Sequence, residues 1–123
     1  MRKGDLSKLS TPELVARFEK LVLDQEIELL SLESKRYNRL FDRIVDITSE
    51  LKSRDGDERR HLLTFLDHES PHLRYVAAIK CDDLDPSRTR KVLQEIADSG
   101  ITPYALNAGM SLWMKGRKES GEI

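Results

Sequence analysis

The chain has little of several things that mark particular classes of protein. Cysteine occurs once, as Cys81, so no disulfide can form within the chain and a reducing compartment is favoured. Aromatic residues make up 6% of the 123 residues, so Leu, Ile, Val and Ala must fill any core. No apolar run approaches membrane-spanning length, and no apolar stretch follows the charges of residues 1–5. These absences predict a soluble, cytoplasmic protein with no membrane partner.

Net charge and catalytic motifs are also scarce. The 21 basic and 22 acidic residues leave a formal charge of −1, so no global field attracts nucleic acid. Neither a phosphate-cradling Gly-rich loop nor a nucleophile elbow is present. His68 and His72 straddle Pro71, which predicts that they and His61 are surface residues near a turn rather than metal ligands. Cys81 ends an apolar segment and is expected to be structural. We therefore predict no enzyme, no metal and no cofactor.

What the sequence contains is a succession of helical patterns. Ser10 and Glu13 have the spacing of a capping box, and Pro12 suits a first helical turn. Gly and Pro then punctuate the later segments, and no alternating β pattern occurs. Six helices are predicted, at about residues 11–32, 34–53, 57–67, 71–82, 86–98 and 103–115. The apolar stripe of the second should comprise Tyr37, Leu40, Phe41, Ile44, Ile47, Thr48 and Leu51.

Part of the chain repeats after about 30 residues. The segment 61–66 (HLLTFL) aligns with 91–96 (KVLQEI), and 77–79 (AAI) aligns with 108–110 (AGM). A period of this length, with two helical patterns per unit, is typical of a helical solenoid. We therefore predict an all-α fold in which six helices stack as three antiparallel pairs in a short α-α superhelix. One domain is expected over 1–123, with flexible tails at 1–9 and 116–123.

A family resemblance supports this prediction. Residues 62–78 resemble a HEAT repeat of the armadillo-like superfamily, with a Leu-rich first helix, a turn at Pro71 and a hydrophobic-Arg-x-x-Ala-Ala pattern over 73–78. The match is partial over 86–113, where Ala105 replaces the Arg of that pattern, and His68 replaces the usual Asp of the turn. The whole chain also resembles a small bacterial family of unknown function with HEAT-like folds, at residues 11–14, 37–42 and 108–113. That resemblance implies the fold but no activity.

Basic residues gather at the start of the second predicted helix. Arg36, Arg39 and Arg43 fall within a narrow arc, and cations in a first turn oppose the helix dipole. A candidate anion or partner site therefore comprises Lys35, Arg36, Arg39, Arg43 and, by analogy with the concave side of HEAT-like stacks, Arg74. The alternative is a solvated face on which these arginines pair at i+3 and i+4 with Asp42, Asp46 and Glu50.

The last predicted helix is apolar in almost every direction. A terminal helix of a solenoid should have a polar outer face, so something must cover the excess. The candidate interface comprises Tyr104, Leu106, Met110 and Trp113. The alternative is that this stripe packs inward as core.

Together these features predict a non-enzymatic, HEAT-like protein-interaction module that binds another protein or a second copy of itself. One alternative is a nucleic-acid or phosphate-ligand binder that uses the basic residues. A second is a protective or inhibitory partner of another bacterial protein, for which fold analogy is the support.

Overall fold

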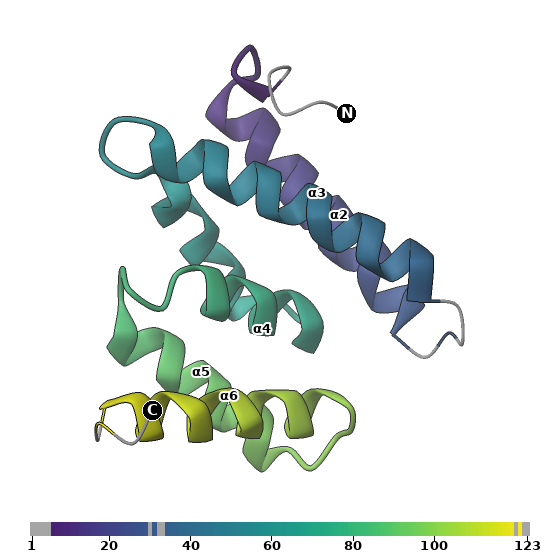
Figure 1. The fold of residues 1–123 in the computed structure, drawn as a ribbon, viewed down its shortest axis with the longest axis vertical. Coiled ribbons are helices and arrows are strands. Elements are labelled where there is room, and N and C mark those ends of the chain that lie inside the picture. Colours follow the sequence, from purple (N-terminus) through teal and green to yellow (C-terminus); the bar gives the residue numbers. More distant parts are fainter. Residues whose placement is uncertain (1–5, 30, 32–33, 120, 122–123) are drawn as a thin grey trace. The chain divides into compact units, whose positions relative to one another are not determined.

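The structure is a computed structural model that describes residues 6–29, 31, 34–119 and 121 (Figure 1). No described residue lies in a β-strand, so the all-α prediction is confirmed. Six helices are bounded within this part of the chain, five of them α-helices and one a 3₁₀ helix. They are α2 (Thr11–Glu28), α3 (Ser34–Ser53), η1 (Glu58–Asp67), α4 (Pro71–Lys80), α5 (Pro86–Asp98) and α6 (Tyr104–Glu119).

Side-chain caps define three helix starts. The Ser10 hydroxyl accepts the Glu13 N–H at 3.2 Å, and the Glu13 carboxylate accepts the Ser10 N–H at 3.0 Å, which confirms the predicted capping box. The bond from the Ser10 backbone lowers the pKa of Glu13. Ser70 caps α4 by accepting the Leu73 N–H at 3.1 Å, and Asp85 caps α5. Local sequence signals thus set these boundaries.

Three boundaries or types differ from the prediction. The segment predicted as a helix over 57–67 is a 3₁₀ helix, and α2 ends at Glu28, before the expected 32. Helix α6 continues to Glu119, so residues 116–119 are not the flexible tail that the sequence predicts. Contacts of its last turns account for this: the Lys115 ammonium lies 3.3 Å from the Asp82 carboxylate, and the Arg117 guanidinium lies 4.8 Å from the Trp113 ring centre. Residues 1–5, 120 and 122–123 of the predicted tails lie outside the described residues.

Contacts divide the chain into two compact units, with the boundary inside η1 between residues 64 and 65. In the first unit α2 and α3 pack along each other (Figure 1). The core between them is made by Leu14, Phe18, Leu21 and Val22 of α2 with Leu40, Ile44, Ile47 and Leu51 of α3. The prediction that Phe41 joins this core is wrong, since its side chain is 48% exposed. One facing helix covers only a narrow stripe, and Phe41 lies a full 100° step from Leu40.

Arg54 fastens the segment before α2 to the end of α3. Its Nη2 donates to the carbonyl oxygens of Leu6 and Leu9 at 3.1 and 2.6 Å, and Nη1 donates to the Thr11 hydroxyl at 3.2 Å. Its Nε donates to Glu50 at 3.0 Å. Leu6 is buried, so this part of the predicted flexible lead-in is packed.

The second unit contains α4, α5 and α6. Helices α5 and α6 share the most extensive contact, while α4 packs on α5 and, to a smaller extent, on α6. Ala77 of α4 and Ala108 of α6 are both fully buried, as is Cys81. His72 is also buried, so its predicted surface position is wrong. Pro71 begins α4 rather than separating His72 from it, and the imidazole stacks near the Tyr75 ring.

Candidate functional site

The four basic residues predicted on the second helix all lie on α3 and are all exposed. Arg36 pairs with a carboxylate of another helix, since its Nε lies 2.9 Å from Glu28 at the end of α2. Glu50, one of the carboxylates expected to pair with the arginines of this helix, pairs instead with Arg54. A contact between helices therefore explains one cation in the first turn of α3.

The fifth residue of the predicted basic site, Arg74, belongs to another helix. It lies on α4 in the second unit, where its side chain is half-buried and its Nε makes no hydrogen bond within the described residues. Within the first unit the predicted basic site comprises Lys35, Arg36, Arg39 and Arg43, all on α3.

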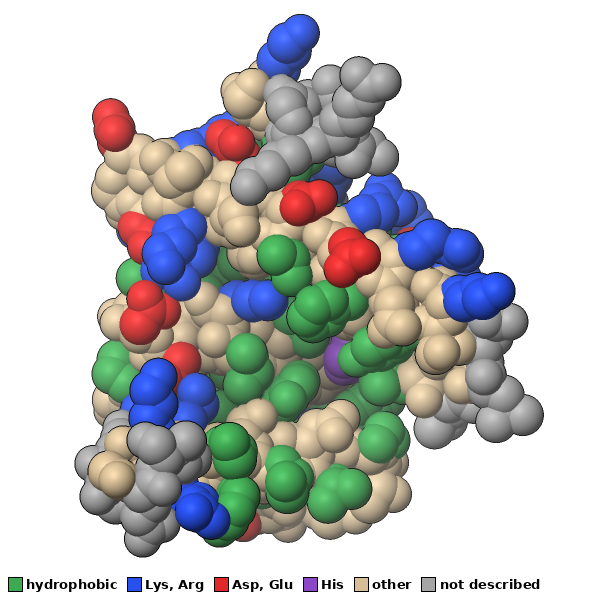
Figure 2. Space-filling view, viewed as in Figure 1, with side chains coloured by type: hydrophobic (Ala, Val, Ile, Leu, Met, Phe, Trp, Pro, Cys, Tyr) green, Lys and Arg blue, Asp and Glu red, His purple; other side chains and the backbone are tan. Residues whose placement is uncertain are grey.

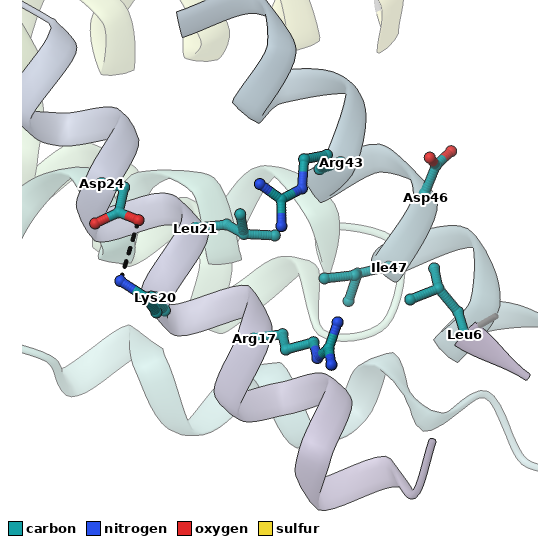
Figure 3. A pocket seen from close by; sticks show the side chains of 8 residues that line it. All are labelled: Leu6, Arg17, Lys20, Leu21, Asp24, Arg43, Asp46 and Ile47. Atoms are coloured by element: carbon teal, nitrogen blue, oxygen red, sulfur yellow. Dashed lines mark hydrogen bonds and ion pairs between the residues drawn. The ribbon is translucent and has the colours of Figure 1, made fainter. Parts of the chain in front are cut away.

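One of these residues lines a cavity in the first unit (Figure 3). Its volume is about 250 Å³, and its lining residues are Leu6, Arg17, Lys20, Leu21, Asp24, Arg43, Asp46 and Ile47. Arg17 and Arg43 reach it from α2 and α3, and their guanidinium groups end on either side of Leu21 and Ile47 (Figure 3). Sequence reasoning identified Arg43 but missed Arg17, since that residue reads as part of the polar face of α2.

The outer side of α6 carries large exposed apolar residues. Leu106 is 64% exposed, while Met110 and Trp113 are each 53% exposed. Their positions follow i, i+4 and i+7, so they form one stripe, and hydrophobic side chains gather over α6 in Figure 2. Tyr104 is half-buried at the start of the helix. The inward-packed alternative therefore does not describe Leu106, Met110 or Trp113.

An apolar groove runs beside this stripe in the second unit. Tyr75 and Ile79 of α4 form one wall, and the Tyr75 hydroxyl lies 3.1 Å from the Ser111 hydroxyl of α6. The lining on α6 consists of Asn107, Met110, Ser111, Met114, Lys115 and Lys118, and the groove holds about 480 Å³. Tyr75, Ile79 and Met114 were not among the predicted site residues. The i, i+4 spacing of Tyr75 and Ile79 on α4 was the available signal for those two, but it equally fits a core stripe.

Charge along the groove is one-sided. Lys115 and Lys118 lie at the C-terminal end of α6. At the opposite end of the helix, the first turn contains no acidic residue. Lys115 is already paired with Asp82, which also lies 3.6 Å from Arg90 Nε. Lys118 is exposed and makes no ion pair within the part of the chain described. The groove is therefore apolar along its length and cationic at one end.

Histidine, cysteine and carboxylate side chains are scattered over the described residues. These residues contain no cluster of three or more His, Cys, Asp or Glu side chains that could hold a metal ion. Cys81 is fully buried, so its thiol is out of reach of a substrate. His61 is exposed and 2.6 Å from Glu58, a pair within one turn of η1. Among the described helices, none combines the length and apolar character needed to cross a membrane.

Comparison with known proteins gives two matches. The family described as "Domain of unknown function (DUF2019)" matches residues 12–114. The crystal structure of the protein RPA1889 from Rhodopseudomonas palustris CGA009 is similar, with 36% sequence identity and a TM-score of 0.87. That match covers 90% of this chain and 92% of the other. No curated protein matches the chain.

Proposed function

The chain belongs to the DUF2019 family of domains of unknown function, and we propose that it is a non-enzymatic protein-interaction module. The observation that carries this proposal is the exposed stripe of Leu106, Met110 and Trp113 beside the groove between α4 and α6. Monomeric proteins seldom expose contiguous apolar surface of this kind unless it marks a contact. Aromatic and Met side chains are also enriched in the cores of interfaces.

A HEAT-like arrangement is the second part of the proposal. Successive pairs would be α2 with α3, η1 with α4, and α5 with α6, in keeping with the repeat of about 30 residues. Helices α4 and α6 are then second helices of neighbouring pairs. In HEAT-like stacks such helices tend to line the concave binding side, so the groove would lie where these folds bind their partners.

We assign the groove to an amphipathic helix of another protein. Its lining on α6 runs from Asn107 to Lys118, which corresponds to roughly 16 Å along the helix axis. That length accommodates about three turns of a partner helix, whose apolar face would present anchors at i, i+3 or i+4, and i+7. The walls supplied by Tyr75, Ile79, Met110 and Met114 suit such anchors, because Met side chains adapt to irregular apolar shapes.

Charge favours an acidic helix over a second copy of this chain. A partner carboxylate at the Lys118 end would complement an exposed cation that has no acidic partner within the described residues. Two copies of α6 packed antiparallel would instead place this basic end against a first turn without acidic residues. The occupant we propose is therefore an amphipathic helical segment with a carboxylate near one end.

Nucleic acid is a weaker candidate. Arg36 is engaged with Glu28, so a carboxylate already neutralises one of the predicted cations. A protective or inhibitory role toward another bacterial protein would be one use of the proposed groove.

Helix-forming peptides test this function directly. Fluorescence polarisation would compare a 14-residue peptide with Leu at i, i+4 and i+7 and Glu near one end against the same peptide with Lys in place of Glu. We expect the acidic peptide to bind up to about tenfold more tightly, because an exposed pair with Lys118 contributes about 0.2–1 kcal/mol and the basic peptide replaces this attraction with repulsion. Met110→Asp should abolish binding, whereas Ile101→Asp, the same change at a residue that is 60% exposed outside α6, should not.

Two results would contradict the proposal. One is binding that survives Met110→Asp or prefers the basic peptide. The other is concentration-dependent dimerisation in sedimentation that Met110→Asp abolishes, since a second copy would then occupy the groove.

A further inference from the structure

From the cavity between α2 and α3 we infer a second, independent site in the first unit, one that binds a small apolar monocarboxylate. The floor is apolar, because Leu6, Leu21 and Ile47 line the cavity while their own side chains are almost fully buried. Such residues expose only the part of their surface that faces the cavity. A ligand body seated there would gain hydrophobic contact without displacing any charged group.

Cations from both helices surround this apolar floor. Arg17 of α2 and Arg43 of α3 place guanidinium groups on either side of Leu21 and Ile47 (Figure 3). Arg43 makes no hydrogen bond or ion pair within the described part of the chain, so its donors are available to a ligand. A guanidinium presents parallel N–H donors that match the two oxygens of a carboxylate.

The charge count limits the ligand to a monoanion. Three cations, Arg17, Lys20 and Arg43, face two carboxylates, Asp24 and Asp46, which leaves a lining charge of +1. Lys20 and Asp24 lie 3.3 Å apart and neutralise each other at one side of the cavity (Figure 3). A dianion such as phosphate would exceed this charge, whereas one carboxylate matches it.

The volume sets the size of the ligand. At about 250 Å³ the cavity is smaller than the ~300–1,000 Å³ of pockets that bind drug-sized molecules. It corresponds to about eight water molecules at ~30 Å³ each, so a carboxylate with a chain of about six carbons fits. Amino acids are disfavoured, because their ammonium group would lie beside Arg17 and Arg43.

The test uses hexanoate, with hexylammonium as a probe of matched size and opposite charge. In two-dimensional amide NMR spectra of the whole chain, we expect hexanoate to shift residues 17–24 and 43–47 saturably, while hexylammonium leaves them unchanged. Arg43→Gln should weaken hexanoate binding by about tenfold or more, as expected for loss of a charge-assisted hydrogen bond. Arg39→Gln is the matched control, since Arg39 is also an exposed cation, lies one turn earlier on α3 and does not line the cavity.

Arg43 is exposed, so its replacement should leave the thermal melt unchanged and the comparison valid. The inference is overturned if hexanoate causes no saturable shift, if hexylammonium binds as tightly, or if Arg39→Gln weakens binding as much as Arg43→Gln. Substitutions in α6 should have no effect, which separates this site from the groove of the second unit.

Discussion

Replacing Arg54 should destabilise the first unit more than any other single change to a charged residue there. Its guanidinium joins four groups: the carbonyl oxygens of Leu6 and Leu9, the Thr11 hydroxyl and the Glu50 carboxylate. The Arg54→Ala change removes all four contacts at once. It leaves a carboxylate, whose side chain is 17% exposed, without its partner.

The expected decrease in the free energy of unfolding follows from these contacts. A hydrogen bond to a charged group contributes about 1.5–3 kcal/mol, and removing one partner leaves the other to be solvated. Four such bonds do not add, because Arg54 itself is 20% exposed and water can reach part of the site. We therefore expect Arg54→Ala to lower the free energy of unfolding by about 2–4 kcal/mol.

Urea unfolding followed by circular dichroism measures this loss. The fluorescence of Trp113, the one tryptophan of the chain, reports on α6 in the second unit. Its transition can be compared in the same sample with the transition seen by circular dichroism. Arg54→Lys keeps the charge but lacks the planar fork of N–H donors. Its free energy of unfolding should therefore lie between those of Arg54→Ala and the wild type. Arg60→Ala, at an exposed cation, should stay within about 0.5 kcal/mol of the wild type. An Arg54→Ala midpoint equal to that of the wild type would refute the reasoning.

Three further predictions concern packing, capping and pH. Ala77→Leu should lower the free energy of unfolding by about 1–3 kcal/mol through overpacking, whereas Ala16→Leu at an exposed position of α2 should not; denaturant titration of both variants checks this. Ser70→Ala should cost about 1 kcal/mol in the same assay, because it removes the cap of α4. Hydrogen bonds from Arg59 lower the pKa of Asp57 below 3.8, so stability from this carboxylate is complete above that pH and is lost as the pH falls through the lowered value. Thermal melts on either side of pH 3.8 should show a smaller loss for Asp57→Asn than for the wild type.

Features encoded by neighbours in sequence were predictable. The capping box of Ser10 and Glu13 and the breaks at Pro71 and Pro86 need only a few adjacent residues, and the structure places helix boundaries there. The apolar excess of α6 could also be recognised from the sequence. A helix at the end of a stack is covered on one side, and α6 carries apolar residues on more sides than that.

Features that depend on distant residues were not predictable. Arg54 contacts Leu6 and Thr11 from 48 and 43 positions away, and nothing in the local sequence indicates these partners. The burial of His72 and the exposure of Phe41 depend on which neighbouring side chains face them, which periodicity alone does not determine. The pairing of Arg36 with Glu28 likewise joins two different helices, so an i+4 rule within one helix misses it.

The most direct test of the proposed function is site-specific photo-crosslinking in the native host. A photoreactive amino acid at Leu106, which is 64% exposed on α6, would be compared with the same residue at Ile27, which is 76% exposed on α2. We expect a crosslink at Leu106 but not at Ile27, to another protein and within an amphipathic helix that carries acidic residues. Crosslinks at both positions alike, no crosslink at Leu106, or a crosslink to a second copy of this chain would contradict the assignment of the α6 groove to a partner helix.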